Sequence, residues 1–349
     1  MQKIKLAGLL LLLFLVVGCE RSVDEKELIS FTGSTMGTTY SVKFTVNTDL
    51  SFNTSFVKGN VDSVLAEVNR QMSTYIPDSE ISTFNSSRDT GWFNISADFA
   101  RVLTAANEVS KQSGGAFDIT VSPLINLWGF GPQIHENEIP SDADILESKK
   151  FVGYWNLEVD TVNNRIKKSI PELTIDLSAI AKGYGVDKVA EYLEDRGFKN
   201  YMVEIGGEVR TKGHPATASE WKIGISTPDN NFGIQSVLHL NDISVATSGD
   251  YRNYFEKDGV RYSHTIDPNT GKPITHNLAS VSVIHPSCMY ADAYATAMSV
   301  MGADKAMEFA EKSRLDIYLL KKEAEEFVEG QTRGMDKYLV IYENGEEKK

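Results

Sequence analysis

The chain has 349 residues and an acidic balance, with 35 lysines and arginines against 48 aspartates and glutamates and a formal net charge of −13. This charge argues against nucleic acid as a partner, because binding to phosphate backbones needs clustered basic residues. An anionic ligand would have to be held by a local cation or a metal ion. With only two cysteines, Cys19 and Cys288, we expect a large buried core rather than disulfides to stabilise the chain.

The N-terminal residues have the order of a secretory signal, with Lys3 and Lys5 ahead of an apolar run over residues 6–17. That run is too short to cross a bilayer, which needs roughly 20 apolar residues. It ends in a glycine followed by Cys19, which resembles a bacterial lipobox. We therefore predict a signal peptide over residues 1–18 and a Cys19 that carries lipid, palmitate included, on its sulfur and amino group. The alternative is an ordinary cleaved signal that happens to contain a cysteine.

This prediction makes the chain a bacterial membrane lipoprotein that faces the periplasm or the cell exterior, because two or more acyl chains give stable anchoring. Residues 19–30 combine the lipidated cysteine with a charged stretch that has no sustained pattern. We predict that this stretch is a tether and that one folded domain spans residues 31–345.

The first half of that domain begins with Tyr40, Val42, Phe44 and Val46, which alternate with polar residues and predict a half-buried strand. Apolar residues at helical spacing follow, and they predict helices over residues 57–72 and 99–109, the second ended by the glycine pair at 114–115.

The second half mixes strands and helices. A predicted strand at 173–177 leads into a helix at about 178–195, and another helix is predicted from 291 to about 312. Further strands are predicted at 201–205, 221–225, 237–240, 243–246, 279–284, 315–320 and 338–342, with a hairpin at 255–262 around Asp258-Gly259. The pattern predicts an α+β fold: a single elaborated domain with a mixed, largely antiparallel sheet and packed helices.

Two glycine-containing stretches could approach a ligand. Small and hydroxyl residues crowd residues 33–40 (GSTMGTTY), where backbone N–H groups could come close to a bound group, although a simple strand-entry turn fits as well. Residues 114–123 (GGAFDITVSP) lead from a glycine pair into an apolar segment with one acid, Asp118. The alternative there is a helix C-cap followed by a strand.

Residues 175–185 (IDLSAIAKGYG) run from a strand into a helix, and helix N-termini attract anions. Lys182 falls in the first turn, where a cation opposes the helix dipole, and such local conflicts tend to mark sites. Asp176 could equally be an N-terminal cap of the helix.

Two further stretches contain candidate side chains. His264 precedes the turn sequence Asp-Pro-Asn-Thr-Gly, although a lone histidine is more often structural. Asp292 and Thr296 are four residues apart on a predicted helix, hence on one face, and their hard oxygen atoms suit Mg2+. Taken alone, Asp292 could be an ordinary first-turn acid.

Together and in this order, these stretches resemble the ApbE-type FAD:protein FMN transferases, long described as thiamine-biosynthesis lipoproteins. The resemblance runs from about residue 31 to 302 and includes MSTYIPDSEIS around Tyr75, EIGGEVRTKG, ATSGDY, HTIDPNTGKP and ADAYATAM. It implies an α+β fold built around a T-fold-like core.

The resemblance also implies roles for individual residues. His264 would be catalytic, and metal binding would fall to the side chains of Asp292 and Thr296 with the carbonyls of Ala179 and Ala295. The residues implied in FAD binding are Met36, Tyr75, Ala116, Phe117, Asp118, Asp176, Lys182, Gly206 and Gly207.

The implied reaction is a Mg2+-dependent transfer of FMN from FAD to a Thr or Ser hydroxyl of an exported acceptor protein, with release of AMP. His264 would serve as general base, with Asp118 as the next candidate. One alternative is a Mg2+-dependent FAD pyrophosphatase, which would use the same site with water as acceptor. Another is a non-catalytic flavin-binding lipoprotein.

Overall fold

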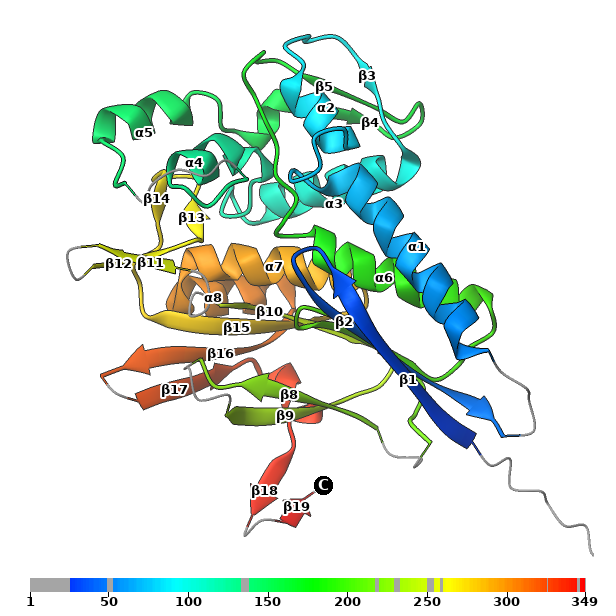
Figure 1. The fold of residues 1–349 in the computed structure, drawn as a ribbon. Coiled ribbons are helices and arrows are strands. Elements are labelled where there is room, and N and C mark those ends of the chain that lie inside the picture. The colour runs from blue at the N-terminus through cyan, green and yellow to red at the C-terminus, as the bar shows by residue number, and fades with distance from the viewer. Residues whose placement is uncertain are drawn as a thin grey trace, which may run out of the picture.

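An eight-stranded antiparallel sheet forms the centre of the fold (Figure 1). The computed structural model describes residues 26–48, 53–132, 138–216, 220–228, 233–249, 254–257, 260–324, 326–343 and 346–348. In spatial order, the strands are β1 (Lys26–Thr35), β2 (Thr38–Asn47), β6 (Tyr201–Ile205), β7 (Glu208–Lys212), β10 (Ser244–Gly249), β15 (Leu278–His285), β16 (Asp316–Glu323) and β17 (Glu326–Gln331).

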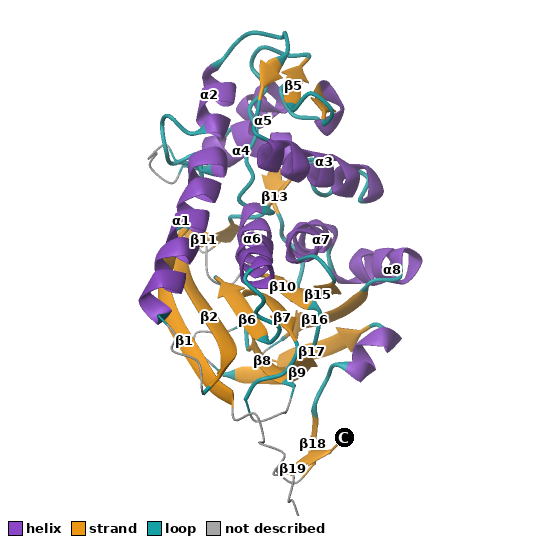
Figure 2. Cartoon of the chain, turned by 90° about the vertical axis from the view of Figure 1, so that its right-hand side faces the viewer, coloured by secondary structure: helices purple, strands orange, loops and turns teal. Residues whose placement is uncertain are grey.

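Helices cover one face of this sheet, and a hairpin covers the other (Figure 2). The helical layer consists of α6 (Ala181–Asp195), α7 (Cys288–Met301) and α8 (Ala303–Ser313), with α1 (Thr54–Met72) and α3 (Ala97–Gln112) beside it. The hairpin pairs β8 (Trp221–Ser226) with β9 (Ile234–Leu240) and buries Trp221 and Leu238 against the sheet. Because α7 is covered by sheet and helices, most of its residues are apolar and buried.

A second group of short elements stands above the helical layer (Figure 1). It contains α2 (Glu80–Ser86), α4 (Ser122–Leu127), α5 (Asp142–Lys149), β3 (Phe93–Asn94), β4 (Leu157–Asp160), β5 (Arg165–Lys168) and 3-10 turns at Ile119–Val121 and Tyr154–Asn156. The pairs β11 (Tyr254–Lys257) with β12 (Val260–Ser263) and β13 (Ile266–Asp267) with β14 (Lys272–Pro273) lie beside α4. A 3-10 turn (Arg333–Lys337), β18 (Ile341–Glu343) and β19 (Glu346–Lys348) complete the chain.

The α+β class and the antiparallel sheet confirm the sequence-based expectation, but two elements differ. The predicted helix over 291–312 is two helices, α7 and α8, separated at Gly302, whose φ of 79° breaks the helix. The predicted strand at 173–177 is extended and buried, yet it forms no ladder. The side chain of Asn85 bonds both the N–H and the carbonyl of Ile175, at 2.8 Å each, which satisfies the backbone without a neighbouring strand.

The predicted tether also needs correction. Residues 26–30 are part of β1, whose ladder with β2 pairs Ile29 with Phe44. The sequence pattern missed this strand because β1 lies at the edge of the sheet and several of its side chains are exposed. Cys19 and the Asp258-Gly259 turn of the predicted hairpin lie outside the described residues. No helix within the described ranges is long and apolar enough to span a membrane.

Candidate active site

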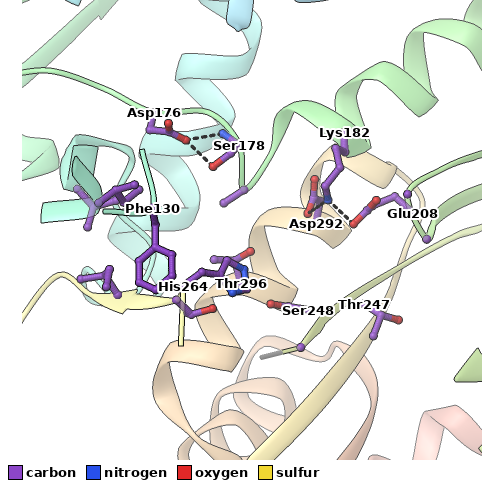
Figure 3. Close-up of a pocket in the computed structure, with 18 of the residues that line it drawn as sticks. Phe130, Asp176, Ser178, Lys182, Glu208, Thr247, Ser248, His264, Asp292 and Thr296 are labelled. Atoms are coloured by element: carbon purple, nitrogen blue, oxygen red, sulfur yellow. Dashed lines mark hydrogen bonds and ion pairs between the residues drawn. The ribbon is translucent and has the colours of Figure 1, made fainter. Parts of the chain in front are cut away.

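A cavity of about 470 Å³ opens between the start of α6, the part of α7 that carries Asp292 and Thr296, and the sheet (Figure 3). Ala179 and Lys182 come from the start of α6, and Asp292 and Thr296 come from α7. The turn between β6 and β7 supplies Gly206 and Gly207, and Glu208 is the first residue of β7. The connection from β12 to β13 supplies His264.

Asp292 lies at the contact between the two helices and is only 5% exposed. The backbone N–H of Gly183 donates to its Oδ2 at 3.0 Å, and Lys182 Nζ lies 3.8 Å from its Oδ1. A Cβ on Gly183 would come within 2.3 Å of the Cys288 carbonyl oxygen, so glycine is required for the helices to approach this closely. One oxygen of Asp292 is thereby fixed by α6, and the other faces the lysine.

Lys182 is held between two acids. Its Nζ lies 2.5 Å from Glu208 Oε1 in addition to its contact with Asp292. Burial by itself lowers the pKa of Lys182, but the charges of Asp292 and Glu208 outweigh burial and hold that pKa above its ordinary value. Lys182 is therefore a stable ammonium at neutral pH.

Glu208 is 2% exposed, and burial raises its pKa, with Asp292 adding to the rise and Lys182 opposing it. Its Oε2 is buried without a hydrogen-bond partner among the described residues. One ammonium thus faces two acidic side chains, and an acceptor oxygen remains unused.

A second cavity, of about 660 Å³, adjoins the first and shares with it Tyr75, Asp176, Ser178 and Lys182. Met36 lines this second cavity from the turn between β1 and β2, with a φ of 49° that is uncommon for a residue with a side chain. Tyr75 is 69% exposed although it borders both cavities. The two cavities therefore adjoin along residues that line both of them.

His264 stands on a segment that aromatic packing holds in place. Its ring meets Phe130 edge-on, with centroids 6.4 Å apart. Nearby, Tyr262 stacks on Trp128, and the Trp128 indole donates to the Gly271 carbonyl at 2.9 Å. These contacts join α4 to both sides of the Asp-Pro-Asn-Thr-Gly turn, so the histidine is presented to the cavity from a braced position.

Four residues of the expected site lie outside the lining of both cavities: Ala116, Phe117, Asp118 and Ala295. The Asp118 carboxylate is buried and accepts hydrogen bonds from the N–H and hydroxyl of Thr120 and the N–H of Tyr154, at 2.6–2.9 Å. Burial raises the pKa of Asp118. The segment forms a 3-10 turn and α4 rather than the alternative strand, and Ile119 accepts the N–H of Asp176 at 2.8 Å. It therefore supports the cavity wall from behind.

Asp176 lines both cavities but does not cap the helix. Its carboxylate accepts the N–H of Ser178 at 2.8 Å, as well as the Ser178 hydroxyl, whereas α6 begins only at Ala181, after the cap residue Ile180. The alternative interpretation of Asp176 as an N-cap is therefore wrong. The acid instead shapes the loop that carries Ala179 to the cavity lining.

Sequence reasoning did not identify Glu208 as a lining residue. It also missed Gly224, Ser226, Thr247 and Ser248, which line the same cavity. Glu208 had a usable signal, because it is an acid directly after a glycine pair at the start of a short strand. Within the described ranges, no three His, Cys, Asp or Glu side chains form a metal-binding group. Any metal in this cavity would therefore depend on hydroxyl and carbonyl oxygens as well as carboxylates.

The fold and the cavity define the class of protein: a helix-covered antiparallel sheet whose cavity is lined by a lysine, three acids and a histidine. The chain belongs to the ApbE family, whose family model matches residues 36–319. It is 42% identical over 318 residues to the FAD:protein FMN transferase of Vibrio cholerae serotype O1, which covers 91% of this chain and 93% of that relative. The corresponding protein of Haemophilus influenzae is 43% identical over 309 residues, with coverage of 87% and 89%.

Solved structures give the same result for the fold. The flavin transferase ApbE from Vibrio cholerae superposes with a TM-score of 0.83 at 40% identity, covering 90% of this chain and 100% of that chain. The flavinyl transferase ApbE from Pseudomonas stutzeri, in its apo form, gives a TM-score of 0.82 at 38% identity, with coverage of 89% and 96%. The chain therefore has the fold of the ApbE flavin transferases, as the sequence motifs indicated.

Proposed function

We propose that this chain is an FAD:protein FMN transferase that moves FMN from FAD to a Thr or Ser hydroxyl of an exported acceptor protein and releases AMP. The observation that carries the proposal is the convergence of Lys182, Asp292, Thr296 and His264 on one cavity. Membership of the ApbE family and 42% identity to a relative named for this activity support it further.

The cavity suits the pyrophosphate of FAD. The start of α6 lies at this cavity, and helix N-termini attract anions through free N–H groups and the helix dipole. The Lys182 ammonium adds a full positive charge at the start of α6. These groups would bind and orient the two phosphates, leaving the adjoining cavity beside Met36 and Tyr75 for other parts of FAD.

The oxygen atoms around Asp292 fit Mg2+. Asp292, the Thr296 hydroxyl and the Ala179 carbonyl supply only hard oxygen ligands, which Mg2+ prefers. The unused Oε2 of Glu208 and the two acids facing one ammonium favour a cation in the same place. When bound, Mg2+ would neutralise charge on the pyrophosphate oxygens. The Ala295 carbonyl, implied by the family resemblance, belongs to a residue outside the lining and is the weakest member of the proposed set.

His264 would take the proton of the acceptor hydroxyl as general base. The hydroxyl oxygen then forms a bond to the phosphorus on the FMN side of the pyrophosphate, and the P–O bond to AMP breaks. AMP leaves with its phosphate, and FMN remains attached to the acceptor through a phosphoester. We also propose that export and a lipid anchor on Cys19 bring the chain to the compartment of its acceptor.

Incubation of the soluble chain with FAD, Mg2+ and a threonine-containing acceptor tests the proposal, with the Thr→Val form of the acceptor as control. We expect AMP release together with a mass gain of one FMN on the threonine form alone. Release of FMN and AMP with no acceptor modified would identify an FAD pyrophosphatase. Bound FAD without any product would identify a flavin-binding protein, and either outcome would contradict the proposal.

A further inference from the structure

Asp187 is a fully buried acid in the middle of α6, outside the lining of both cavities. Its carboxylate accepts four hydrogen bonds. Two come from the backbone N–H groups of Cys288 and Met289, at 3.1 and 3.0 Å, and one comes from the Ser287 hydroxyl at 2.6 Å. The fourth comes from Arg210 Nη1 at 2.8 Å.

The first two bonds mean that Asp187 caps α7 from a neighbouring helix. The first N–H groups of a helix lack partners within it, and the residue before the helix usually supplies an acceptor. Here the side chain of Ser287, the N-cap residue, makes no such bond among the described residues and donates instead to Asp187. The position of the α7 N-terminus is therefore set by an atom of α6.

A second contact lies one turn earlier on the same face of α6. The Gly183 N–H donates to Asp292 Oδ2 at 3.0 Å, and a Cβ at Gly183 would meet the Cys288 carbonyl oxygen at 2.3 Å. Gly183 and Asp187 thus hold the first two turns of α7 against α6. These are the turns that lead to Asp292 and Thr296.

Arg210 extends this junction to the sheet. It belongs to β7, the strand that begins with Glu208, and it pairs with Asp187 through Nη1. The three elements that carry Lys182, Asp292 and Glu208 are therefore joined at one buried carboxylate.

We propose that Asp187 is a positioning residue, which fixes α7 so that Asp292 and Thr296 face the start of α6 in the geometry that binds the metal ion. The inference rests on the proposed function, because it takes Asp292 and Thr296 as metal ligands. Loss of the cap should move both residues together. The free energy of metal binding should therefore weaken by more than the free energy of unfolding. Changes in groups that orient metal ligands typically cost about 10–100-fold in metal affinity.

The test is Asp187→Asn, which keeps the shape but replaces one acceptor oxygen with an NH2 group facing N–H and hydroxyl donors. Glu194→Gln is the matched control, since Glu194 is also in α6 and accepts from Arg210 Nη2 at 3.2 Å, while its other partners, Tyr201 and Lys212, lie outside α7. Mn2+ serves as the metal, and its binding to the full chain without FAD is followed by the EPR signal of the free ion. We expect about 10–100-fold weaker Mn2+ binding in Asp187→Asn and less than about threefold change in Glu194→Gln.

The variant Asp292→Ala separates a failure of the proposed metal site from a failure of the positioning role of Asp187. If the wild type binds no Mn2+, or if Asp292→Ala binds it as tightly as the wild type does, the metal site is wrong. In either case the inference fails with it. If Asp292→Ala loses the metal but Asp187→Asn binds it as Glu194→Gln does, the positioning role is overturned while the metal site stands. If Asp187→Asn does not fold, Gly183→Ala replaces it, because the added Cβ displaces α7 with Asp187 intact. The same loss of Mn2+ affinity is then expected, and unchanged affinity would overturn the inference.

Discussion

His264 and Asp118 illustrate how surroundings decide the role of a titratable side chain. His264 lines the cavity and packs edge-on against Phe130, and a substrate hydroxyl in the cavity could reach it. Asp118 lies behind the wall, and both of its carboxylate oxygens accept hydrogen bonds from the protein. Although both were candidates for the general base, only His264 is placed to meet a substrate.

His264→Ala should reduce FMN transfer by about 10²–10⁴-fold, the usual contribution of a general base. Affinity for FAD should stay within roughly tenfold, or about 1.4 kcal/mol, because the base contacts the incoming hydroxyl rather than FAD. Single-turnover transfer and FAD titration measure the two quantities, and His214→Ala, outside both cavities, is the control. A variant that loses FAD binding and melts at lower temperature would show that His264 is structural.

Asp118→Asn should lower the free energy of unfolding by about 1–3 kcal/mol, because the new NH2 group faces a backbone N–H donor and leaves a buried bond unmade. Activity per folded molecule should change little, since the residue stands behind the cavity. Urea unfolding measures the change in stability, and the transfer assay measures the activity per folded molecule. Unchanged stability with weakened FAD binding would instead support the direct FAD contact that the family resemblance implies.

At the scale of single elements, helix α7 combines the metal candidates with a close approach to α6 at Gly183. Asp292 and Thr296 lie one turn apart on α7, and both reach the cavity. The predicted helix was right about this spacing but missed the break at Gly302, because helical periodicity continues across it into α8. The strand expected at 173–177 was wrong for a different reason: the Asn85 side chain takes the backbone bonds that a ladder would have used.

The metal requirement is a prediction about α7. Chelation should abolish turnover, Zn2+ should not be needed, and Asp292→Ala should raise the Mg2+ concentration for half-maximal activity by at least about tenfold, or ~1.4 kcal/mol. Thr296→Val should act in the same direction, whereas Thr296→Ser keeps the hydroxyl and should stay close to wild type. Mg2+ titrations of AMP release measure all of these. Full activity in excess EDTA would rule the metal out.

Strand β1 allows a test within residues first assigned to a tether. Ile29 packs toward the cluster under β2, whereas the adjacent Leu28 points to the other face and is 44% exposed. Ile29→Ala should cost about 1 kcal/mol of unfolding free energy, less than the roughly 1.5–3 kcal/mol of a fully buried side chain. Leu28→Ala should stay within about 0.5 kcal/mol. Equal and negligible effects in denaturant titrations would restore the tether interpretation.

At the scale of the whole molecule, an acidic chain with a formal net charge of −13 places the Lys182 ammonium where an anionic ligand is expected. The excess of acidic residues elsewhere makes this local arrangement more important, because long-range attraction cannot gather the ligand. The predicted lipid anchor on Cys19 also affects the whole molecule, since it would determine the compartment in which the reaction takes place.

Cys19→Ser should release the chain from membranes and leave FMN transfer in the soluble fraction intact, because two acyl chains provide the binding and the folded domain does not depend on them. Fractionation of cells followed by a transfer assay tests this. A variant that still pellets with membranes at high salt would contradict lipidation at this cysteine.

The sequence by itself determined the α+β class, the main helices and the chemical types of the site. Each of these depends on residues a few positions apart: alternation marks a strand, spacing of three or four marks a helix face, and short motifs with Tyr75, Lys182, His264 and Asp292 marked the cavity lining. Local patterns of this kind survive folding because backbone geometry repeats within each element.

Tertiary structure alone decided which of these residues meet. Glu208 joined Lys182 and Asp292 because β7 passes beside two helices, and Asp118 lies outside the lining of both cavities because its carboxylate bonds Thr120 and Tyr154. Asp187 gained its place because α6 and α7, about a hundred residues apart in sequence, approach until one helix caps the other. Such contacts have no period along the chain. They arise from the close packing of helices and strands that are distant in sequence, and a short stretch of neighbouring residues carries no information about that packing.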